Sequence, residues 1–346
     1  MKRKRILTGD RPTGPMHLGH YVGSLKNRVR LQDEHDCFFI IADYQVLTDH
    51  LNETERTQDS VRDVVLDWLS VGMDPEKSTF FIQSMVPEIA ELTMYFSMLV
   101  SVSRLQRNPT VKEEFREAGL RSMSYGFLGY PVSQAADILA VRADLVPVGE
   151  DNVPHVEQTR EIARTFNRTF GKTFPVPQAL VGDVSRLPGL DGRKMGVSLG
   201  NAIFLKDTPE QVRTKIRSAI TDPARVKSTD PGHPDVCNIY AYYEAFAGNS
   251  APDVRERCTQ GRVGCVACKE NLAARINAFL EPVREKRVSF ESRPAIVTEA
   301  LGEGTARTRR EAAQTMRLVR EAVHFDYREL LSEREQERVF VPEEVG

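Results

Sequence analysis

Two histidines near the start of the chain are spaced for joint chemistry. His17 and His20 stand three positions apart in the run His17-Leu18-Gly19-His20, so they would share one face of a helix. Gly19 carries no side chain, which lets a flat ring or a phosphate approach the backbone. Two imidazoles beside a helix N-terminus can donate hydrogen bonds to charge that develops on a phosphate. A chance pair on a surface helix would have the same spacing, because short motifs also match by accident.

A strand, a tight turn and a helix must position these histidines. The apolar pair Ile6-Leu7 predicts the first strand of a sheet, which breaks at Gly9. A turn rich in glycine and proline then leads into a helical pattern near Met16. This order of elements presents free backbone N–H groups, and the positive end of a helix dipole, to an anion.

A second candidate for phosphate binding is the glycine-rich loop 187–201, which carries the basic pair Arg193-Lys194. A flexible loop with a lysine can close over a leaving pyrophosphate. Many surface loops are also rich in glycine and basic residues, so this loop alone is a weak signal. Together with the histidine pair it favours nucleotide chemistry.

A carboxylate with an unusual setting is Asp137, which stands among small and apolar residues in the run YPVSQAADIL, residues 130–139. An unpaired carboxylate in such a place would be costly. We therefore expect a partner for Asp137. The partner is either a backbone N–H group at a helix cap or the polar hydrogen of an otherwise apolar ligand.

Four of the five cysteines are grouped with the spacing C-x20-C-x6-C-x2-C, at Cys237, Cys258, Cys265 and Cys268. Sites built from four thiolates hold zinc or an iron–sulfur cluster. The spacing by itself favours zinc, which is the commoner occupant of a closed four-cysteine site. Cys37 lies in an apolar run, and we expect it to be a small buried hydrophobic residue.

The first half of the chain alternates predicted strands and helices. Helices are expected at 61–71 and 89–102, and further strands at 37–42, 79–82, 145–148 and 202–205. Strands separated by helices predict an α/β fold with a doubly wound parallel sheet, which binds ligands at the carboxyl ends of its strands. From Asp207 onward the pattern is mostly helical.

This change of pattern divides the chain. We predict a Rossmann-like domain over 1–206 with a helical insertion at about 104–142, a helical domain over 207–330, and a loosely ordered acidic tail over 331–346. Within the helical domain, the apolar residues 312, 313, 316 and 319 are expected to face the core of a helix bundle.

Composition limits the class of protein. A chain of 346 residues with 40% hydrophobic and 28% charged residues is typical of globular proteins with a substantial core. No apolar run approaches the roughly 18 residues of a membrane span, and the start MKRKRILTGD lacks the apolar stretch of a signal peptide. Few cysteines in a chain of this length favour a reducing compartment, so we expect a cytoplasmic protein without a membrane partner.

The motifs together resemble a known family. HLGH near the N-terminus and KMGVS in the later loop are similar to the two signature motifs of class I aminoacyl-tRNA synthetases. Nearly the whole chain, from RILTGDRPTG to EGTARTRREAAQTMRLVREA, looks like the bacterial tryptophanyl-tRNA synthetase family. The segments that carry this resemblance are YPVSQAADIL, ADLVPVGEDNVPHVEQTREIARTFN, LPGLDGRKM and TDPARVKSTDPG.

The resemblance implies a catalytic domain, a helical anticodon-binding domain and a homodimer. It also implies ATP, Mg²⁺, L-tryptophan and tRNA(Trp) as ligands, and activation of tryptophan to an adenylate before transfer to the tRNA. Three alternatives stay open: a tyrosyl-type synthetase, a paralogue that binds tryptophan or its adenylate without charging tRNA, and an RNA- or protein-binding module built on an inactive synthetase.

The resemblance also implies roles for individual residues. The catalytic residues would be His17, His20 and Lys194. The residues expected to contact ATP are Asp10, Arg11, Thr13, Gly19, His20, Gly149, Asp151, Lys194, Met195 and Ser198. The residues expected to contact tryptophan are Leu7, Tyr130, Gln134, Asp137, Val146, Val148 and Asn152, with Asp137 accepting the indole N–H.

The chain departs from the family pattern at a few positions. The second signature is usually Lys-Met-Ser-Lys-Ser, and here the second lysine is replaced by Val197, which predicts a slower first step. Asn152 stands where the family usually has glutamine, and Gln45 where many relatives have histidine. For the four cysteines the resemblance points to a [4Fe-4S] cluster, because a subset of the bacterial enzymes carries one on this pattern; Zn²⁺ is the alternative.

Overall fold

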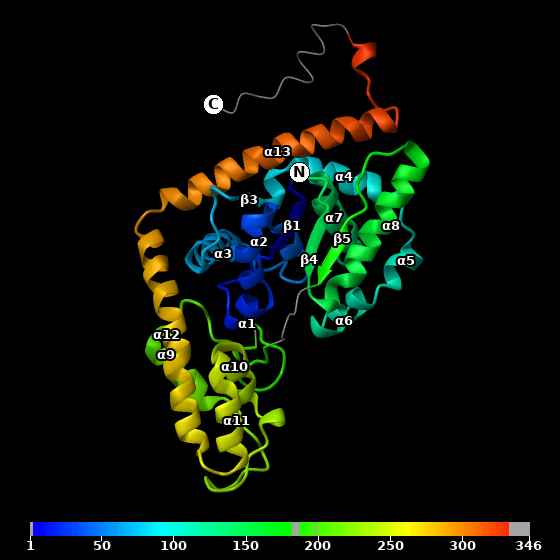
Figure 1. Ribbon diagram of the computed structural model, residues 1–346. Helices are drawn as coiled ribbons and strands as arrows, with labels where there is room; N and C mark the ends of the chain where they lie inside the picture. The colour runs from blue at the N-terminus through cyan, green and yellow to red at the C-terminus, as the bar shows by residue number, and fades with distance from the viewer. Residues whose placement is uncertain (1–2, 182–186, 198, 332–346) are drawn as a thin grey trace.

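The computed structural model of the chain describes residues 3–181, 187–197 and 199–331. Its centre is a five-stranded parallel sheet with the strand order β3-β2-β1-β4-β5 (Figure 1). The strands are Arg5–Asp10 (β1), Asp36–Ile41 (β2), Ser78–Ile82 (β3), Leu145–Val148 (β4) and Gln178–Val181 (β5). The order reverses at β1, and such a switch point opens a crevice at the carboxyl ends of the strands.

Both faces of the sheet are buried at β2 and β3, which explains the continuous apolar runs of these strands. In β2, Phe39 and Ile41 pack on one side with α2 (Lys26–Glu34) and α3 (Thr57–Val71). Phe38 and Ile40 pack on the other side with helices of the second layer. These are α4 (Pro87–Ser97), α7 (Tyr125–Ala140) and α8 (Val153–Phe170). The predicted doubly wound α/β class is confirmed.

The fifth strand was predicted wrongly. The strand that pairs with β4 is Gln178–Val181, not 202–205. Ala202, Ile203 and Leu205 are buried and Phe204 is partly buried, as their apolar character requires, but the backbone of this run pairs with the start of the histidine motif. Leu18 N donates to Ile203 O at 2.9 Å, and Leu205 N donates to Met16 O at 2.9 Å. A short apolar run can either join a sheet or pack against a helix start, because both places bond its backbone groups and bury its side chains.

The helix predicted over 89–102 is two helices in the structure. α4 ends at Ser97, and the hydroxyl of Ser101 then accepts the N–H of Arg104 to cap α5 (Val102–Gln106). The following helix α6 (Pro109–Glu117) is capped in the same way by Asn108. Serine and asparagine are favoured at this position because their side chains satisfy backbone donors that the first helical turn leaves free.

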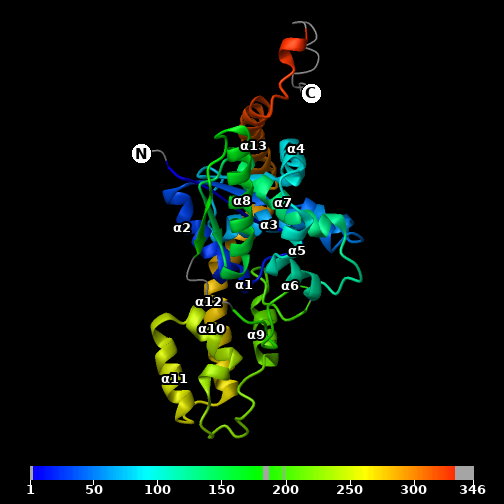
Figure 2. The same cartoon turned by 90° about the vertical axis from the view of Figure 1, so that its right-hand side faces the viewer.

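Beyond residue 208 the described chain is helical. The helices are α9 (Pro209–Ser218), α10 (Asn238–Phe246), α11 (Ala251–Thr259), α12 (Cys265–Glu291) and α13 (Ala295–Ala322). Helices α9 to α11 project away from the sheet, α12 runs from them back to α3, and α13 runs along the sheet (Figures 1 and 2). None of the helices in the described residues is long and apolar enough to cross a membrane.

Helix α13 belongs to the core around the sheet. At Gly304 the helix touches β3 so closely that a Cβ atom would lie 1.9 Å from the carbonyl oxygen of Phe80. Ala312, Met316 and Val319 pack in the same core as α4 and α7. The expectation that this stripe faces a helix bundle is therefore wrong. The sheet face offered a larger apolar partner than the short helices α9 to α11.

Helix α12 is tied to the sheet layer by a buried arginine. Arg287 forms ion pairs with Asp63 and Asp67 of α3. The second carboxylate oxygen of Asp67 accepts the backbone N–H of Met16 at 2.8 Å. Burial raises the pKa of Asp67 to about 6, although the Arg287 charge opposes this rise. The helical region is thus connected to the turn that precedes His17.

Candidate active site

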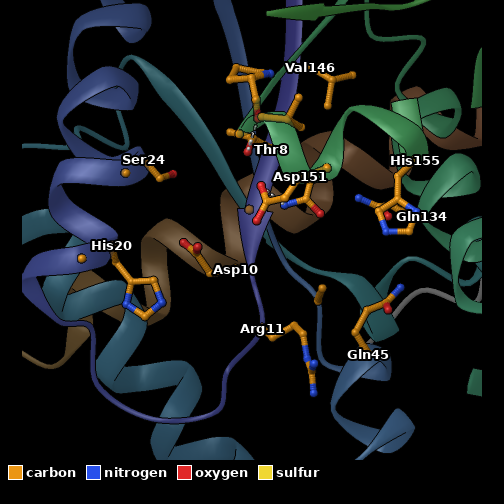
Figure 3. A pocket seen from close by; sticks show the side chains of 18 of the residues that line it. Thr8, Asp10, Arg11, His20, Ser24, Gln45, Gln134, Val146, Asp151 and His155 are labelled. Carbon is orange, nitrogen blue, oxygen red and sulfur yellow. Dashed lines mark hydrogen bonds between the residues drawn. The ribbon is translucent and has the colours of Figure 1, made fainter. Parts of the chain in front are cut away.

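A cavity of about 1240 Å³ opens at the carboxyl ends of the strands. In Figure 3, Asp10, Arg11 and His20 lie on one side of it and Gln134 and His155 on the other. The loop 187–195 completes the lining. Most of the residues predicted to bind ligands therefore meet in one place, as the switch point of the sheet requires.

The two motif histidines cap each other. His17 is the N-cap of α1 (Leu18–His20), and the backbone N–H of each histidine donates to Nδ1 of the other, at 3.2 and 3.3 Å. Their rings stack with centroids 3.7 Å apart. Because both Nδ1 atoms accept, each neutral ring must carry its proton on Nε2. The motif therefore holds two Nε2–H donors side by side.

The same geometry keeps both histidines uncharged. Burial, and to a smaller extent the neighbouring His20, lowers the pKa of His17 to about 3. Burial also lowers the pKa of His20, although the charge of Asp10 opposes this. Both rings are thus neutral near pH 7 and act as hydrogen-bond donors without adding full positive charge. The short helix continues into a single π-helical segment, Tyr21–Leu25, and then into α2.

Asp10, at the end of β1, is held by a buried cation. Burial raises its pKa, but the Arg28 guanidinium, its ion-pair partner, together with His20 and Trp68, lowers it more, so the pKa of Asp10 lies below its usual value. The indole N–H of Trp68 also donates to Asp10, at 3.0 Å. With these partners, Asp10 is a fixed carboxylate that borders the cavity.

The glycine-rich loop faces the histidine motif. A Cβ atom on Gly19 would lie 3.2 Å from Sδ of Met195 and 3.0 Å from Nδ1 of His17, so only glycine leaves a flat surface there. Asn201 fixes the loop, because its side chain accepts the N–H of Gly196 and donates to the carbonyl of Lys194, both at 3.0 Å. The Lys194 ammonium donates to a carboxylate oxygen of Glu117 in α6 at 3.0 Å.

Of the predicted ATP residues, one lies in another cavity and one is not described. Thr13 lines a neighbouring cavity of about 320 Å³ together with His20, Arg11 and Val197. Ser198 is outside the described residues. The remaining predicted residues for ATP line the larger cavity; they are Asp10, Arg11, Gly19, His20, Gly149, Asp151, Lys194 and Met195.

All predicted residues for the amino acid also line that cavity: Leu7, Tyr130, Gln134, Asp137, Val146, Val148 and Asn152. Asp137 is buried and accepts a hydrogen bond of 2.8 Å from the side chain of Gln83. Burial raises the pKa of Asp137 to about 7. One carboxylate oxygen thus has a partner, and Asp137 borders the cavity.

Sequence reasoning missed a chain of hydrogen bonds around Tyr130. Asn108 donates to Nδ1 of His155 at 3.3 Å, so Nε2 of this histidine carries the proton and donates to the Tyr130 oxygen at 3.0 Å. Tyr130 in turn donates to Glu114 at 2.5 Å. Glu114 belongs to a helix whose charges resemble an ordinary solvated face. His155 had a recognisable signal: like His17, it opens a helix that follows a sheet strand.

The four grouped cysteines lie at the far part of the helical region. Cys237 precedes α10, Cys258 lies in α11, and Cys265 and Cys268 open α12. Nη1 of Arg225 lies 3.6 Å from Sγ of Cys258 and 3.9 Å from Sγ of Cys265. Within residues 3–181, 187–197 and 199–331, no three His, Cys, Asp or Glu side chains are arranged to hold a single metal ion.

Comparison with known proteins decides the family. The family model for class I tRNA synthetases (W and Y) matches residues 1–281. The tryptophan–tRNA ligase of Treponema pallidum is 49% identical over 332 residues, which cover 94% of this chain and 98% of that protein. The chain belongs to the class I tryptophanyl-tRNA synthetases.

Other tryptophanyl-tRNA synthetases agree in sequence and in structure. The tryptophan–tRNA ligase of Thermotoga maritima is 46% identical over 324 residues, covering 92% of this chain and 99% of that one. The crystal structure of the tryptophanyl-tRNA synthetase from Campylobacter jejuni, complexed with ADP and tryptophan, superposes with a TM-score of 0.81 at 33% identity. That match covers 92% of this chain and 99% of the other.

Proposed function

We propose that the cavity activates L-tryptophan with ATP and that the enzyme transfers the product to tRNA(Trp). A tryptophan carboxylate oxygen attacks the α-phosphorus of ATP, the bond to the bridging oxygen breaks, and pyrophosphate leaves. The 3′-terminal hydroxyl of the tRNA then attacks the activated carbonyl, and AMP leaves. The observation that carries the proposal is the meeting of the HLGH motif, the Lys194 loop and the buried Asp137 around one cavity. No protein nucleophile is needed, so placement and charge stabilisation supply the rate.

His17 and His20 are assigned to the phosphates. Their two Nε2–H groups would donate to oxygens whose negative charge grows as the α-phosphorus is attacked. Neutral donors that are already held in place need no reorganisation in the transition state. Gly19 would leave room for the adenine, and Lys194 would pair with the leaving pyrophosphate.

Magnesium is expected to arrive with ATP. It is held mainly by substrate phosphates and by few protein carboxylates in sites of this kind. Asp10 is already paired with Arg28 and Trp68, so it does not offer a free magnesium ligand. No step above depends on a protein-bound magnesium ion.

Asp137 is assigned to the indole N–H. A buried acceptor that bonds the substrate N–H rejects amino acids that lack this donor. Tyr130, Gln134 and Asn152 would surround the other end of the amino acid, and Leu7 with Val146 would pack against the ring. Tyr130 is oriented by its bonds to Glu114 and His155, which supports a fixed pocket.

The first experiment is ATP–pyrophosphate exchange with tryptophan, tyrosine or phenylalanine. We expect exchange with tryptophan only, and loss of the tryptophan preference in Asp137→Ala. Exchange with tyrosine would favour the tyrosyl-type alternative. The absence of exchange with all three amino acids would favour a binding protein and contradict the proposal.

A second experiment separates charging from activation. Aminoacylation of tRNA(Trp) should follow exchange, and we infer that helices α9 to α12 serve as the anticodon-binding region. Helix α13, which the sequence pattern also assigned to this domain, packs on the sheet instead. Exchange without aminoacylation would favour the paralogue that holds tryptophan or its adenylate for another use. Because charging takes place where the tRNA is, a cytoplasmic location is proposed as well.

We also propose that Cys237, Cys258, Cys265 and Cys268 bind a [4Fe-4S] cluster, with Zn²⁺ as the alternative. Four thiols of one region match the donor set of both. The choice of the cluster rests on the resemblance to the bacterial enzymes that carry one on this cysteine pattern. When bound, the cluster would connect the ends of α10, α11 and α12.

Anaerobic purification tests this assignment. We expect brown protein with stoichiometric iron and sulfide, which Cys258→Ala loses and Cys37→Ala keeps, because Cys37 is buried in the sheet core away from the group. Colourless protein with stoichiometric zinc would support the alternative. Iron and sulfide that survive in Cys258→Ala would contradict the ligand set.

A homodimer is proposed from the family and from an exposed apolar surface. Met85, Met94, Met98 and Val102, between β3 and α5, are more than half exposed. Large apolar side chains exposed along one stretch of the chain are typical of sites of protein association. Light scattering should give a dimer mass, and Met98→Lys should shift it toward the monomer. A monomer mass for the wild-type protein would contradict the proposal.

A further inference from the structure

A fully buried glutamine lies behind Asp137. Gln83 follows β3 at the start of a short 3-10 segment, Gln83–Met85, and its side chain is not exposed at all. Its Nε2 donates to Oδ1 of Asp137 at 2.8 Å, and its Oε1 accepts the backbone N–H of Tyr44 at 3.1 Å. A backbone N–H can only donate, so the orientation of the Gln83 amide is fixed.

The Gln83 side chain is braced from two strands. Tyr44 follows β2, and Asp43 beside it accepts the backbone N–H of Ser84 at 2.9 Å. Asp43 also accepts the Tyr44 N–H at 3.1 Å and the Ser84 hydroxyl. The turns after β2 and β3 are thus bound together. A residue held from both sides can fix the carboxylate of a third element, α7.

We propose that Gln83 is a positioning residue for tryptophan specificity, which holds one oxygen of Asp137 so that the other stays an acceptor for the indole N–H. The inference rests on the role proposed above for Asp137. The N–H of the Gln83 amide requires an acceptor, and Oδ1 of the Asp137 carboxylate is that acceptor. Asp137 is then held as a carboxylate, with no proton facing the ligand. A carboxylic acid free of Gln83 could rotate and present an O–H, which would repel the indole donor.

The surroundings of Asp137 make this control necessary. Burial raises the pKa of its carboxyl to about 7, the hydrogen bond from Gln83 opposes the rise, and the charge of Asp43 adds to it. The ionised form of Asp137, which accepts a hydrogen bond, and its protonated form, which can donate one, are therefore close in free energy near neutral pH. A single neutral amide can decide between them, because one buried hydrogen bond contributes on that scale.

The test compares two substrates that differ only in the donor. Tryptophan has an indole N–H, whereas 3-benzothienylalanine has sulfur in its place and donates nothing. In Gln83→Met, which keeps the side-chain length, we expect kcat/KM for tryptophan in pyrophosphate exchange to fall roughly tenfold or more. The kcat/KM for 3-benzothienylalanine should stay unchanged, so the preference for tryptophan falls by the same factor.

Matched variants separate positioning from folding. Ser84→Ala removes a bond to Asp43 in the same turn without touching Asp137, and it should affect both amino acids equally. Gln83→Asn keeps the amide but shortens it, and it should give a partial loss for tryptophan alone. Equal losses for the two amino acids in both Gln83 variants, or no loss in either, would overturn the inference.

A variant of Asp137 itself distinguishes a failure of the role proposed for Asp137 from a failure of the role proposed for Gln83. Asp137→Asn should lose the preference for tryptophan over 3-benzothienylalanine. If this variant keeps the preference, the assignment of Asp137 fails and the Gln83 inference fails with it. If Asp137→Asn loses the preference and Gln83→Met keeps it, only the role of Gln83 is wrong.

Discussion

The ammonium of Lys194 lies 3.0 Å from a carboxylate oxygen of Glu117. This ion pair joins the glycine-rich loop to α6. In the pair, Glu117 neutralises the lysine that we assign to pyrophosphate binding. Both side chains are about half exposed, at 56% and 48%. ATP must therefore separate a weak pair before Lys194 can contact its phosphates.

Removing the ion pair between Lys194 and Glu117 should strengthen ATP binding. In Glu117→Gln we expect KM for ATP in pyrophosphate exchange to fall about two- to fivefold, because an exposed pair of this kind contributes little free energy. KM for tryptophan should not change. Glu113→Gln, on the exposed side of the same helix, serves as the control. An unchanged or higher KM for ATP in Glu117→Gln would show that the pair does not compete with the nucleotide.

A second lysine should speed the first step. Val197, at the position where the usual family motif has a lysine, borders the smaller cavity of about 320 Å³ next to Gly14. Val197→Lys adds positive charge near the leaving pyrophosphate, and we expect adenylate formation to become about tenfold faster in single-turnover experiments. Val197→Met, which adds length without charge, should leave the rate unaltered. Equal rates for wild type and Val197→Lys would refute this account of the motif.

Tryptophan binding should weaken in acid. The ionised form of Asp137 is the acceptor, and its pKa is raised to about 7. KM for tryptophan should therefore be constant above pH 7 and rise, by up to about tenfold per pH unit, as pH falls below it. The pKa of His17, lowered to about 3, lies outside this range. KM for ATP is the internal control, and a flat profile for tryptophan would contradict the assignment.

The buried ion pairs of Arg287 should matter for stability. Arg287→Met leaves Asp67 buried without its cation, and we expect the free energy of unfolding to fall by about 3–5 kcal/mol in urea titrations. Adding Asp67→Asn should recover part of the loss, since the amide oxygen can still accept the Met16 N–H. Arg293→Met, at an exposed arginine, should change stability little. Similar losses in both arginine variants would argue against a special role for this network.

Local sequence determined the parts of the site that are contiguous in the chain. The apolar run of β1, its glycine turn and the His17-to-His20 spacing act over a few residues, so pattern alone located them. The alternation of strands and helices likewise predicted the doubly wound sheet, because strand and helix periods differ. The same local signals also brought the loop around Lys194 to attention.

Tertiary structure decided which distant segments meet. The run 202–205 became a support for α1, while Gln178–Val181, the less apolar of the two segments, took the edge place in the sheet. Gln83 is relevant to the site only because it bonds Asp137, 54 positions away in the sequence. Glu117 is relevant only because it pairs with Lys194, 77 positions away. Polar pairs of this kind leave no periodic signal in a single sequence, because their free energy depends on burial and distance that only the folded chain supplies.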